Sequence, residues 1–386
     1  MKPIRKLSRV PTAKITAQLA AASAGRCEFR GCNNFLFEHP LTLRQGNFSQ
    51  QAHIVAFSED GPRGQDALRP SDINTIENLM LLCPVCHKEI DDNPGEYPRD
   101  LLESFKKEHE DRIRFQTNAG PEMRTSILVL KTKIGGSAVT ITEREVRDAI
   151  APKYPWNRQG TDIDLTTINY DTPNEYYSLA ARQIDEQVAG LLTGGVSEGI
   201  PSHLSVFALA QIPLLVHLGR CLSNKIQVDL FQRHRDQDSP WKWPNDSNPV
   251  TYRTTTKQKG TSPGRVALLL SLSGGMDAAA LPNEIDDSYT IYEIGLENTE
   301  PSPDFLRSAG DLSAFRREYR QFLGMLLQCH QPLDDLHVFP AIPAPIAVAC
   351  GHDLLPKVHP TLVVYDRDRR SGGFIERLKV NEHDKK

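Results

Sequence analysis

The feature that most constrains this chain is Asn78–His87, in which four apolar residues lead directly into two close cysteines. The apolar residues have the composition of a short buried strand. Cys83 and Cys86 are separated by two residues, a spacing that lets one tight turn supply two thiolates to a zinc ion. A second pair, Cys27 and Cys32, lies upstream. The four cysteines predict a closed structural zinc site, which stabilises a fold but does no chemistry.

Three polar residues follow a fixed order around these pairs. His53 lies in the strand-like run Gln51–Ala56, Asn78 follows 25 residues later, and His87 comes nine residues after Asn78. Taken singly, a histidine in an apolar strand is usually a packed core residue, and the cysteine pairs are equally typical of a zinc ribbon that only binds. In this order, however, residues 25–110 resemble the His-Asn-His (HNH) endonucleases, which have a ββα-metal fold.

The resemblance implies a role for each polar residue. His53 corresponds to the general base that activates water, Asn78 to the residue whose amide orients that imidazole, and His87 to a ligand of a catalytic divalent cation, Mg²⁺ or a similar ion. Many members carry an acid just before the base, and here that position is Ala52. Gln50 lies on the same face of the strand and offers an amide oxygen as a substitute ligand, which is weaker than a carboxylate.

The charge distribution favours a nuclease without sequence preference. The net charge is −4, so no overall field attracts nucleic acid, and residues 1–118 contain no helix with a base-reading pattern. Phosphate contacts would bind double-stranded DNA without reading its bases, although Arg63 is equally typical of a solvated surface. The candidate cations are Arg26, Arg30, Arg44, Arg63 and Lys88.

The domain organisation changes at Thr117–Met123, which combines Asn118, Gly120 and Pro121 and is typical of a linker. We expect an endonuclease domain at 1–116, a linker at 117–124 and a second domain at 125–386 with pseudo-repeats at about 125–260 and 261–386. The cysteine usage is typical of a reducing compartment, and the sequence has no run of 18 apolar residues that would span a membrane. We therefore expect a cytoplasmic protein.

Two similar series of elements are predicted in the second domain. The first is strand Ile163–Tyr170, helix Asn174–Leu192, strand His203–Leu209, helix Leu214–Leu222 and strand Lys225–Phe231. The second is strand Tyr289–Leu296, helix Asp311–Cys329, strand Leu336–Pro340, a helix through Ala347 and Gly351, and strand Thr361–Asp366. An Ile-Pro turn precedes the second helix of each series, at positions 130 residues apart. This alternation predicts a duplicated α/β fold with largely parallel sheets.

Three segments of the second domain carry a family resemblance: Val206–Leu215, Gln232–Arg235 followed by Trp241–Trp243, and Phe339–Pro345. With the duplication, they resemble the SAVED domain, in which two Rossmann-like halves akin to the CRISPR-associated (CARF) sensors bind cyclic oligonucleotides. An HNH nuclease joined to a SAVED domain is similar to the DNA-degrading effectors of bacterial cyclic-oligonucleotide-based anti-phage signalling systems (CBASS). The resemblance thus implies an α+β nuclease fused to a duplicated, CARF-like α/β sensor.

The composition of two loops adds candidate contacts for a nucleotide. Leu268–Met276 is typical of a buried strand that ends in a Ser-Gly-Gly turn, where backbone N–H groups can meet phosphate, although such turns are equally common without a ligand. The segment after Phe231 offers rings and cations that suit a purine, or else it packs as a loop around Pro240 and Pro244. The candidate ligand-binding residues are Gln232, Arg233, His234, Arg235, Trp241, Trp243, Ser273, Gly274, Gly275, Pro343 and Lys357.

We therefore expect a cyclic-oligonucleotide-activated, metal-dependent endonuclease that degrades double-stranded DNA in anti-phage defence. The alternative is a ligand-responsive, zinc-containing DNA-binding regulator that does not cut. The expected ions are structural Zn²⁺ and catalytic Mg²⁺ or a similar cation. The expected partners are double-stranded DNA, a cyclic di- or trinucleotide such as a cGAMP isomer, and further copies of the chain, as a dimer that assembles into a tetramer when the ligand binds.

Overall fold

The computed structural model describes most of the chain in several stretches. These are residues 9–134, 137–138, 140–156, 160–168, 172–193, 202–222, 226–244, 248–276, 280–333, 335–367 and 373–382. The backbone forms two compact units, Met1–Glu122 and Met123–Lys386.

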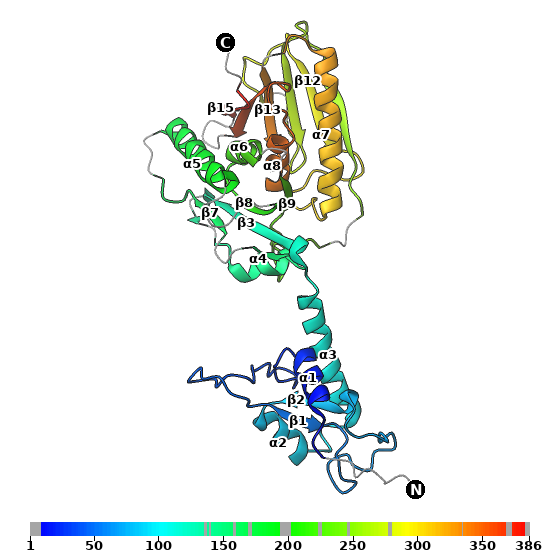
Figure 1. Ribbon diagram of the computed structural model, residues 1–386. Coiled ribbons are helices and arrows are strands. Elements are labelled where there is room, and N and C mark those ends of the chain that lie inside the picture. The colour runs from blue at the N-terminus through cyan, green and yellow to red at the C-terminus, as the bar shows by residue number, and fades with distance from the viewer. Residues whose placement is uncertain are drawn as a thin grey trace. The chain divides into compact units, whose positions relative to one another are not determined.

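The N-terminal unit is built on a two-stranded antiparallel sheet (Figure 1). Its elements are α1 (Ala13–Ala22), β1 (Gln50–His53), the 3₁₀-helix η1 (Ile76–Asn78), β2 (Leu79–Leu82), α2 (Pro84–Asp92) and α3 (Arg99–Thr117). Gln50 of β1 pairs with Leu82 of β2, and His53 pairs with Leu79. All four residues of β2 are buried, and a single residue, Cys83, separates the strand from α2. The ββα order implied by the resemblance is confirmed.

The first helix, α1, has a capping residue at its start and a left-handed turn at its end. The Oγ1 of Thr12 accepts the N–H of Ile15 at 3.4 Å and caps α1. Ala24 and Gly25 then have positive φ angles of 52° and 66°, so the chain leaves the helix in the left-handed conformation.

The C-terminal unit contains two sheets and their connecting helices. Its elements are η2 (Pro121–Met123, at the boundary), β3 (Arg124–Lys131), β4 (Lys133–Ile134), β5 (Ser137–Ala138), α4 (Glu143–Ile150), β6 (Tyr154–Pro155), β7 (Thr161–Asp164), α5 (Pro173–Thr193), β8 (His203–Leu209), α6 (Ile212–Leu222), β9 (Gln227–Phe231), β10 (Tyr252–Gln258), β11 (Val266–Ser271), β12 (Thr290–Leu296), α7 (Ala309–Cys329), β13 (Asp335–Ala341), α8 (Ala344–His352), β14 (Thr361–Arg367) and β15 (Phe374–Val380).

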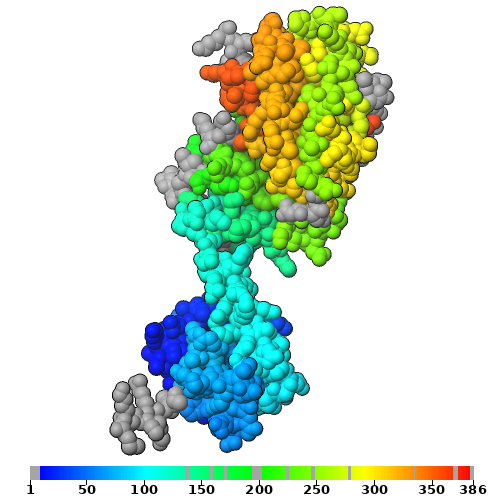
Figure 2. All heavy atoms as spheres, turned by 90° about the vertical axis from the view of Figure 1, so that its right-hand side faces the viewer, coloured from blue at the N-terminus to red at the C-terminus, as the bar shows by residue number. Residues whose placement is uncertain are grey.

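The two sheets have matching strand orders, which supports the predicted duplication. In the first sheet, β3 lies between β8 and the pair β6 and β7, and β9 follows β8; all these pairings are parallel. In the second, β11 lies between β12 and β13, β14 follows β13, and antiparallel β10 and β15 form the two edges. Figure 2 shows α7 (orange) beside β10 (yellow-green). Each half therefore repeats the same parallel order, with β6 added to the first sheet and the edge strands β10 and β15 added to the second. The predicted boundary between the repeats at about 260 is wrong, because β10, which precedes it, pairs with β12 of the second sheet.

The boundaries differ from the predictions mainly at the first strand of the first half. β7 covers Thr161–Asp164, whereas Ile163–Tyr170 was expected; positions 169 and 170 lie outside the described residues. Thr166 forms a turn in place of extended backbone, since its N–H and hydroxyl both donate to Asp164 Oδ1.

The central helices α6 and α8 pack against each other through two glycines. A Cβ built on Gly219 would lie 1.9 Å from the backbone oxygen of Val348, and one built on Gly351 would lie 1.8 Å from that of Val216. The two contacts are equivalent, because Gly351 follows Gly219 by 132 residues and Val348 follows Val216 by the same number. The two halves therefore meet in a pseudo-symmetric helix crossing (Figure 1), and only glycine permits the backbones to approach this closely.

The main hydrophobic core of the C-terminal unit is continuous through both halves. Leu215 of α6 and Ile346 of α8 belong to one buried cluster. The same cluster contains Leu128 of β3, from the first sheet, and Leu268 of β11, from the second. None of the described helices is long and apolar enough to cross a membrane.

Candidate nuclease site and ligand-binding face

The four cysteines come together at one point of the N-terminal unit. Their Sγ atoms all lie within 4.8 Å of one another, and none of the four forms a disulfide. Cys27 is fully buried, and Gly31, with a φ of 86°, provides the turn that leads to Cys32. Cys83 caps the start of α2, where its Sγ accepts the N–H of Cys86 at 3.4 Å.

This donor set fits a tetrahedral zinc ion. Four sulfurs at about 2.3 Å from one zinc lie about 3.8 Å from each other, which is within the limit that the Sγ atoms observe. Burial raises the pKa of the Cys27 thiol to about 12, so this sulfur needs a nearby cation to be a thiolate at neutral pH. The cluster joins the turn after α1 to the start of α2.

His53, at the end of β1, is held by Asn74. The Nε2 of His53 lies 2.9 Å from Asn74 Oδ1. Because an amide oxygen only accepts hydrogen bonds, the proton of the neutral ring belongs on Nε2, and Nδ1 is the basic nitrogen. Burial lowers the pKa of the His53 imidazole, which favours the neutral form at pH 7.

Asn78 fixes the backbone that follows His53, not the imidazole. Its Oδ1 accepts the N–H of Val55 at 2.9 Å, and its Nδ2 donates to the carbonyl oxygens of Val55 and Ile73 at 3.0 and 2.9 Å. The expectation that the Asn78 amide contacts the imidazole is therefore wrong. The physical reason is that Asn78 ends η1 beside the loop leaving β1, so backbone groups satisfy its buried amide.

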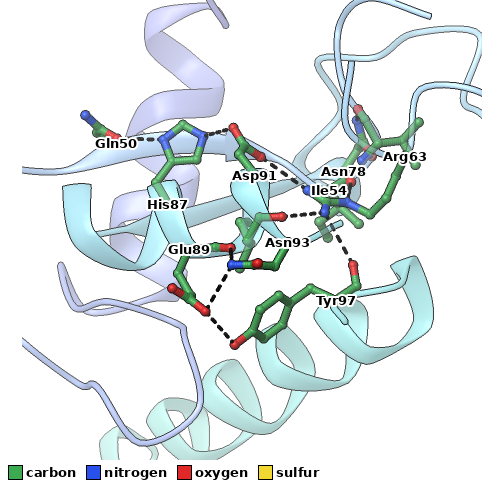
Figure 3. A network of polar contacts seen from close by, with 11 residues as sticks. Gln50, Ile54, Arg63, Asn78, His87, Glu89, Asp91, Asn93 and Tyr97 are labelled. Atoms are coloured by element: carbon green, nitrogen blue, oxygen red, sulfur yellow. Dashed lines mark hydrogen bonds and ion pairs between the residues drawn. The ribbon is translucent and has the colours of Figure 1, made fainter. Parts of the chain in front are cut away.

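His87, on α2, lies between two side-chain oxygen atoms (Figure 3). Its Nδ1 is 2.6 Å from Gln50 Oε1, and its Nε2 is 3.3 Å from Asp91 Oδ2. Burial alone would raise the pKa of the Asp91 carboxyl, but His87 and Arg63 hold it below its ordinary value. An ionised carboxylate therefore stands beside the ring that we expected to bind a cation.

Asp91 and Asn74 are site residues that the sequence reasoning missed. Asp91 carried a usable signal, because it lies four residues after His87 on a helix and such residues share one face. Asn74 carried no such signal, since it lies in the irregular segment before η1.

Arg63 connects β1 to α2 from inside the unit. Its side chain is only 5% exposed. The guanidinium donates to the carbonyl oxygens of Ile54 at 2.6 Å and Ile90 at 2.8 Å, and it reaches Asp91 Oδ1 at 3.4 Å (Figure 3). The expectation of a phosphate contact is wrong for Arg63, because its donors already hold backbone carbonyls and the carboxylate.

The two histidines and Asp91 border one cleft of about 450 Å³. His53, His87 and Asp91 line it together with Arg9. Two imidazoles, a carboxylate and an arginine thus face the same cleft. Phosphodiester hydrolysis requires groups of these kinds, namely a proton acceptor and a holder for a cation.

In the C-terminal unit, the carboxyl ends of the parallel strands form the candidate ligand-binding face. Ser273–Gly275 follows β11 and Pro343 follows β13, and these two strands are paired neighbours. Ligands of open α/β sheets bind outside this edge. The N–H of Ser273 is not free for phosphate as expected, because it donates to the Ala341 carbonyl at 2.7 Å. A Cβ at Gly274 or Gly275 would meet nothing within 4 Å.

The segment after β9 is a packed loop, which was one of the two alternatives. The indole of Trp241 is 1% exposed and lies edge-to-face with Phe207 at 5.3 Å. It has no face left for a base, so the expected ligand contact is wrong for Trp241. His234 is also buried, with its ring 5.7 Å from Trp243. The other candidates of this segment are half-buried or exposed: Gln232, Arg233, Arg235 and Trp243.

Lys357 lies near the amino ends of the parallel strands of the second sheet, opposite the candidate ligand-binding face. β14 begins at Thr361, which pairs with Asp335, the first residue of β13. Lys357 precedes Thr361 by four residues, so it is near the amino ends of these strands, whereas Ser273 and Pro343 follow carboxyl ends. The grouping of Lys357 with those residues is therefore wrong, because α8 carries the chain across the sheet between them.

Comparison with known proteins gives two family matches. The family described as "SMODS-associated and fused to various effectors sensor domain" (SAVED) matches residues 182–380. The HNH endonuclease family matches residues 27–93. No curated protein sequence is significantly similar to the chain.

Similar solved structures include two Cap4 SAVED/CARF-domain containing receptors. The receptor of Acinetobacter baumannii, solved with the cyclic trinucleotide 2'3'3'-cAAA, has a TM-score of 0.45 and 13% identity over 77% of this chain and 60% of the receptor. The receptor of Moraxella osloensis has a TM-score of 0.41 and 11% identity over 76% of this chain and 58% of the receptor. The chain therefore spans about 60% of the length of these receptors.

The family matches fall on the two units described above. The HNH match begins at Cys27 and ends just after α2, so it contains all four cysteines and the three residues of the motif. The sensor match covers 199 of the 386 residues and includes the α6–α8 crossing. Because this is more than half of its length, the chain belongs to the SAVED family, with an HNH endonuclease domain preceding its sensor.

Proposed function

We propose that this protein is an endonuclease that cuts double-stranded DNA without sequence preference when a cyclic oligonucleotide occupies its SAVED domain, as an effector of anti-phage defence. The observation that carries the proposal is the cleft that His53, His87 and Asp91 line together. A base and a cation-binding pair have no evident use in a purely structural zinc module.

His53 acts as the general base in this proposal. Its Nε2–H donates to Asn74 Oδ1, which fixes the ring and leaves the Nδ1 lone pair to take a proton from water. The lowered pKa keeps this nitrogen unprotonated near pH 7. Asn78 contributes indirectly, because it holds the backbone at Val55, two residues beyond the base.

Gln50, His87 and Asp91 are the proposed holders of a catalytic Mg²⁺ or similar cation. Gln50 offers an amide oxygen at Nδ1 of the His87 imidazole, and Asp91 offers a carboxylate oxygen at Nε2, on the other side of the ring. The carboxylate supplies the hard oxygen ligand that such ions prefer. When bound, the cation would offset the negative charge that develops on the scissile phosphate. Arg63 keeps the Asp91 carboxylate oriented and neutralises part of its charge in the free site.

The four cysteines are the proposed ligands of a structural Zn²⁺. Cys83 and Cys86 frame the first turn of α2, and His87 follows Cys86 immediately. The four-sulfur site would therefore fix the position from which His87 reaches Gln50, which is the usual way in which a rigid scaffold preorganises a catalytic group.

The proposed activator is a cyclic di- or trinucleotide, such as a cGAMP isomer, bound at the carboxyl-end face of the sensor. Gly274, Gly275 and Pro343 at the ends of β11 and β13 support this position. The receptor of Acinetobacter baumannii, which is also described as containing a SAVED domain, was solved with a cyclic trinucleotide. We place the protein in the bacterial cytoplasm, where its seven cysteines, all free of disulfides, would stay reduced.

A cleavage assay tests this function. Plasmid DNA is incubated with the full chain, Mg²⁺ and a panel of cyclic di- and trinucleotides, with His53→Ala in parallel. We expect one nucleotide to trigger fragmentation of the wild-type reaction and none to trigger it in the variant. Binding of DNA and nucleotide without cleavage would overturn the proposal and favour the regulator.

A further inference from the structure

A second group of metal-binding side chains lies in the C-terminal unit, on α5 and α6. Asp185 belongs to α5, and His217 and Cys221 belong to α6. One ligand atom from each residue lies within 4.8 Å of the other two. Among the described residues, only this group and the four cysteines bring three or more His, Cys, Asp or Glu ligands so close together.

The three side chains converge on one oxygen atom. Asp185 Oδ1 lies 2.9 Å from His217 Nε2 and 3.0 Å from Cys221 Sγ. His217 and Cys221 are four residues apart on α6, so they share one helix face, and that face is turned toward α5. The convergence is set by two packed helices and not by a mobile loop.

A carboxylate, an imidazole and a thiolate together form a ligand set for a zinc-like transition metal. Zinc takes these ligands at about 2.0–2.3 Å, which places the ligand atoms about 3.3–3.6 Å from one another. The observed separations of 2.9 and 3.0 Å require a widening of a few tenths of an ångström. The thiolate disfavours Mg²⁺ and Ca²⁺, which prefer oxygen ligands.

Protons take the place of a metal in the free cluster. The S–H of Cys221 and the Nε2–H of His217 both point at the same carboxylate oxygen. Metal binding would break the S–H bond and release that proton to water. The imidazole proton would move from Nε2 to Nδ1, which leaves the ring neutral and Nε2 able to hold the metal.

A fourth coordination position is open to solvent. The three residues line a cavity of about 510 Å³ together with Glu382 and Lys379. The cavity gives a metal ion a path to the site, and it provides water or the Glu382 carboxylate as a fourth ligand. A site with three protein ligands and one open position is a common arrangement for zinc.

We propose that Asp185, His217 and Cys221 form a second metal site, specific for Zn²⁺ or a similar transition metal, which clamps α5 to α6. Gly219, which lies between the two α6 ligands in sequence, packs against α8. The metal would therefore hold α6, the helix that joins the two halves of the sensor, against α5. Metal binding should raise the stability of the C-terminal unit. This proposal is independent of the nuclease activity.

Cobalt uptake by the full chain tests the proposal. Co²⁺ is titrated into the protein as purified, so that the four-cysteine site keeps its own ion, and the thiolate-to-cobalt absorption band is followed. We expect a band that saturates at one added equivalent, and its loss in Cys221→Ser. The matched control is Cys329→Ser, because Cys329 is exposed at the end of α7 and its replacement leaves the band unchanged.

Two further variants make the result independent of any one substitution. His217→Gln and Asp185→Asn each keep a polar side chain of similar size, and each should weaken Co²⁺ binding at least about tenfold. Circular dichroism of each variant checks that α5 and α6 remain folded. The proposal would be overturned if folded Cys221→Ser, or both other variants, bound Co²⁺ as well as the wild type does. It would also be overturned if the wild type gave no thiolate-to-cobalt band.

Discussion

At the scale of single residues, the proposed chemistry depends on two imidazoles that are held differently. His53 has one nitrogen fixed by an amide oxygen, and its ring lines the cleft. His87 has both nitrogens close to oxygen atoms, an environment in which a cation is favourable. One ring is thereby suited to accept a proton and the other to share a metal ion with a carboxylate.

Replacement of Asp91 tests the cation-binding pair. We expect Asp91→Asn to lower DNA cleavage about 10–100-fold, because an amide binds Mg²⁺ more weakly than a carboxylate. Raising the Mg²⁺ concentration should restore part of the rate. The control is Asp92→Asn on the same helix, since Asp92 pairs with the exposed Lys88. Equal rates for Asp91→Asn and Asp92→Asn at low Mg²⁺ would contradict the assignment.

The pH dependence of cleavage tests the role of His53. Burial lowers its pKa from the ordinary value of 6.5, and only the neutral ring can act as a base. Activity should therefore persist as the pH falls through 6.5 and decline only at lower pH. Initial rates measured from about pH 5 to 8 at saturating Mg²⁺ check this. An acidic limb centred above 6.5 would show that His53 is not the base, or that its pKa is not lowered.

Single residues also mark where sequence-based inference stops. The cysteine pairs could be found because each has the close spacing of metal ligands, and His53 and His87 because they follow the order of a known motif. The contact between His53 and Asn74 could not, since Asn74 lies in an irregular segment and belongs to no motif. For Trp241, the composition of the loop left packing and ligand stacking equally open, and only the depth of burial decided for packing.

At the scale of elements, the close crossing of α6 and α8 makes the sensor sensitive to small changes. Gly351→Ala would place a Cβ 1.8 Å from the Val216 oxygen, and we expect a loss of about 1–3 kcal/mol or more in the free energy of unfolding. The control is Gly324→Ala in α7, where a Cβ meets nothing within 4 Å and a gain of about 0.5–1 kcal/mol is expected.

Tryptophan fluorescence can follow this unfolding selectively. All three tryptophans, Trp156, Trp241 and Trp243, lie in the C-terminal unit, so a urea titration of the full chain reports that unit. If the two glycine variants unfold at the same urea concentration, the helix crossing is not as close as described.

The four-cysteine cluster should be essential to one unit only. Cys83→Ala removes a zinc ligand, and structural zinc contributes about 10–16 kcal/mol of apparent binding energy in small zinc-finger peptides. We expect the N-terminal unit to unfold and become protease-sensitive. The tryptophan signal of the C-terminal unit should keep its wild-type midpoint. A protease-resistant N-terminal unit in this variant would contradict a structural role for the cluster.

Many of the elements were predictable, because their signals are local, but β3, the central strand of the first sheet, was not among the predicted strands. Thr12 and Gly25 mark the ends of α1, and the two Ile-Pro pairs mark the starts of α6 and α8. The reciprocal contact of Gly219 and Gly351 was not predicted as a contact. Its cause is long-range packing between segments 132 residues apart, for which neither glycine alone gives evidence.

At the scale of the whole molecule, a nuclease without sequence preference must be inactive until its signal is present. A ligand can change activity only if it binds two states with different affinity. We propose that nucleotide binding makes sensor domains associate, so that a dimer becomes a tetramer with competent nuclease domains. Light scattering of the full chain should show the mass double when the nucleotide binds. An unchanged mass with bound nucleotide would rule out assembly as the switch.

The most direct measurement of ligand-gated DNA cleavage is a nucleotide titration in which binding and plasmid cutting are followed in the same samples. At fixed Mg²⁺, wild-type protein without nucleotide should leave the plasmid intact, and cutting should appear as the sensor fills. His53→Ala should bind the nucleotide with the same affinity and cut at least about 100-fold more slowly. Cutting that is independent of nucleotide, or equal in His53→Ala, would contradict the proposed function.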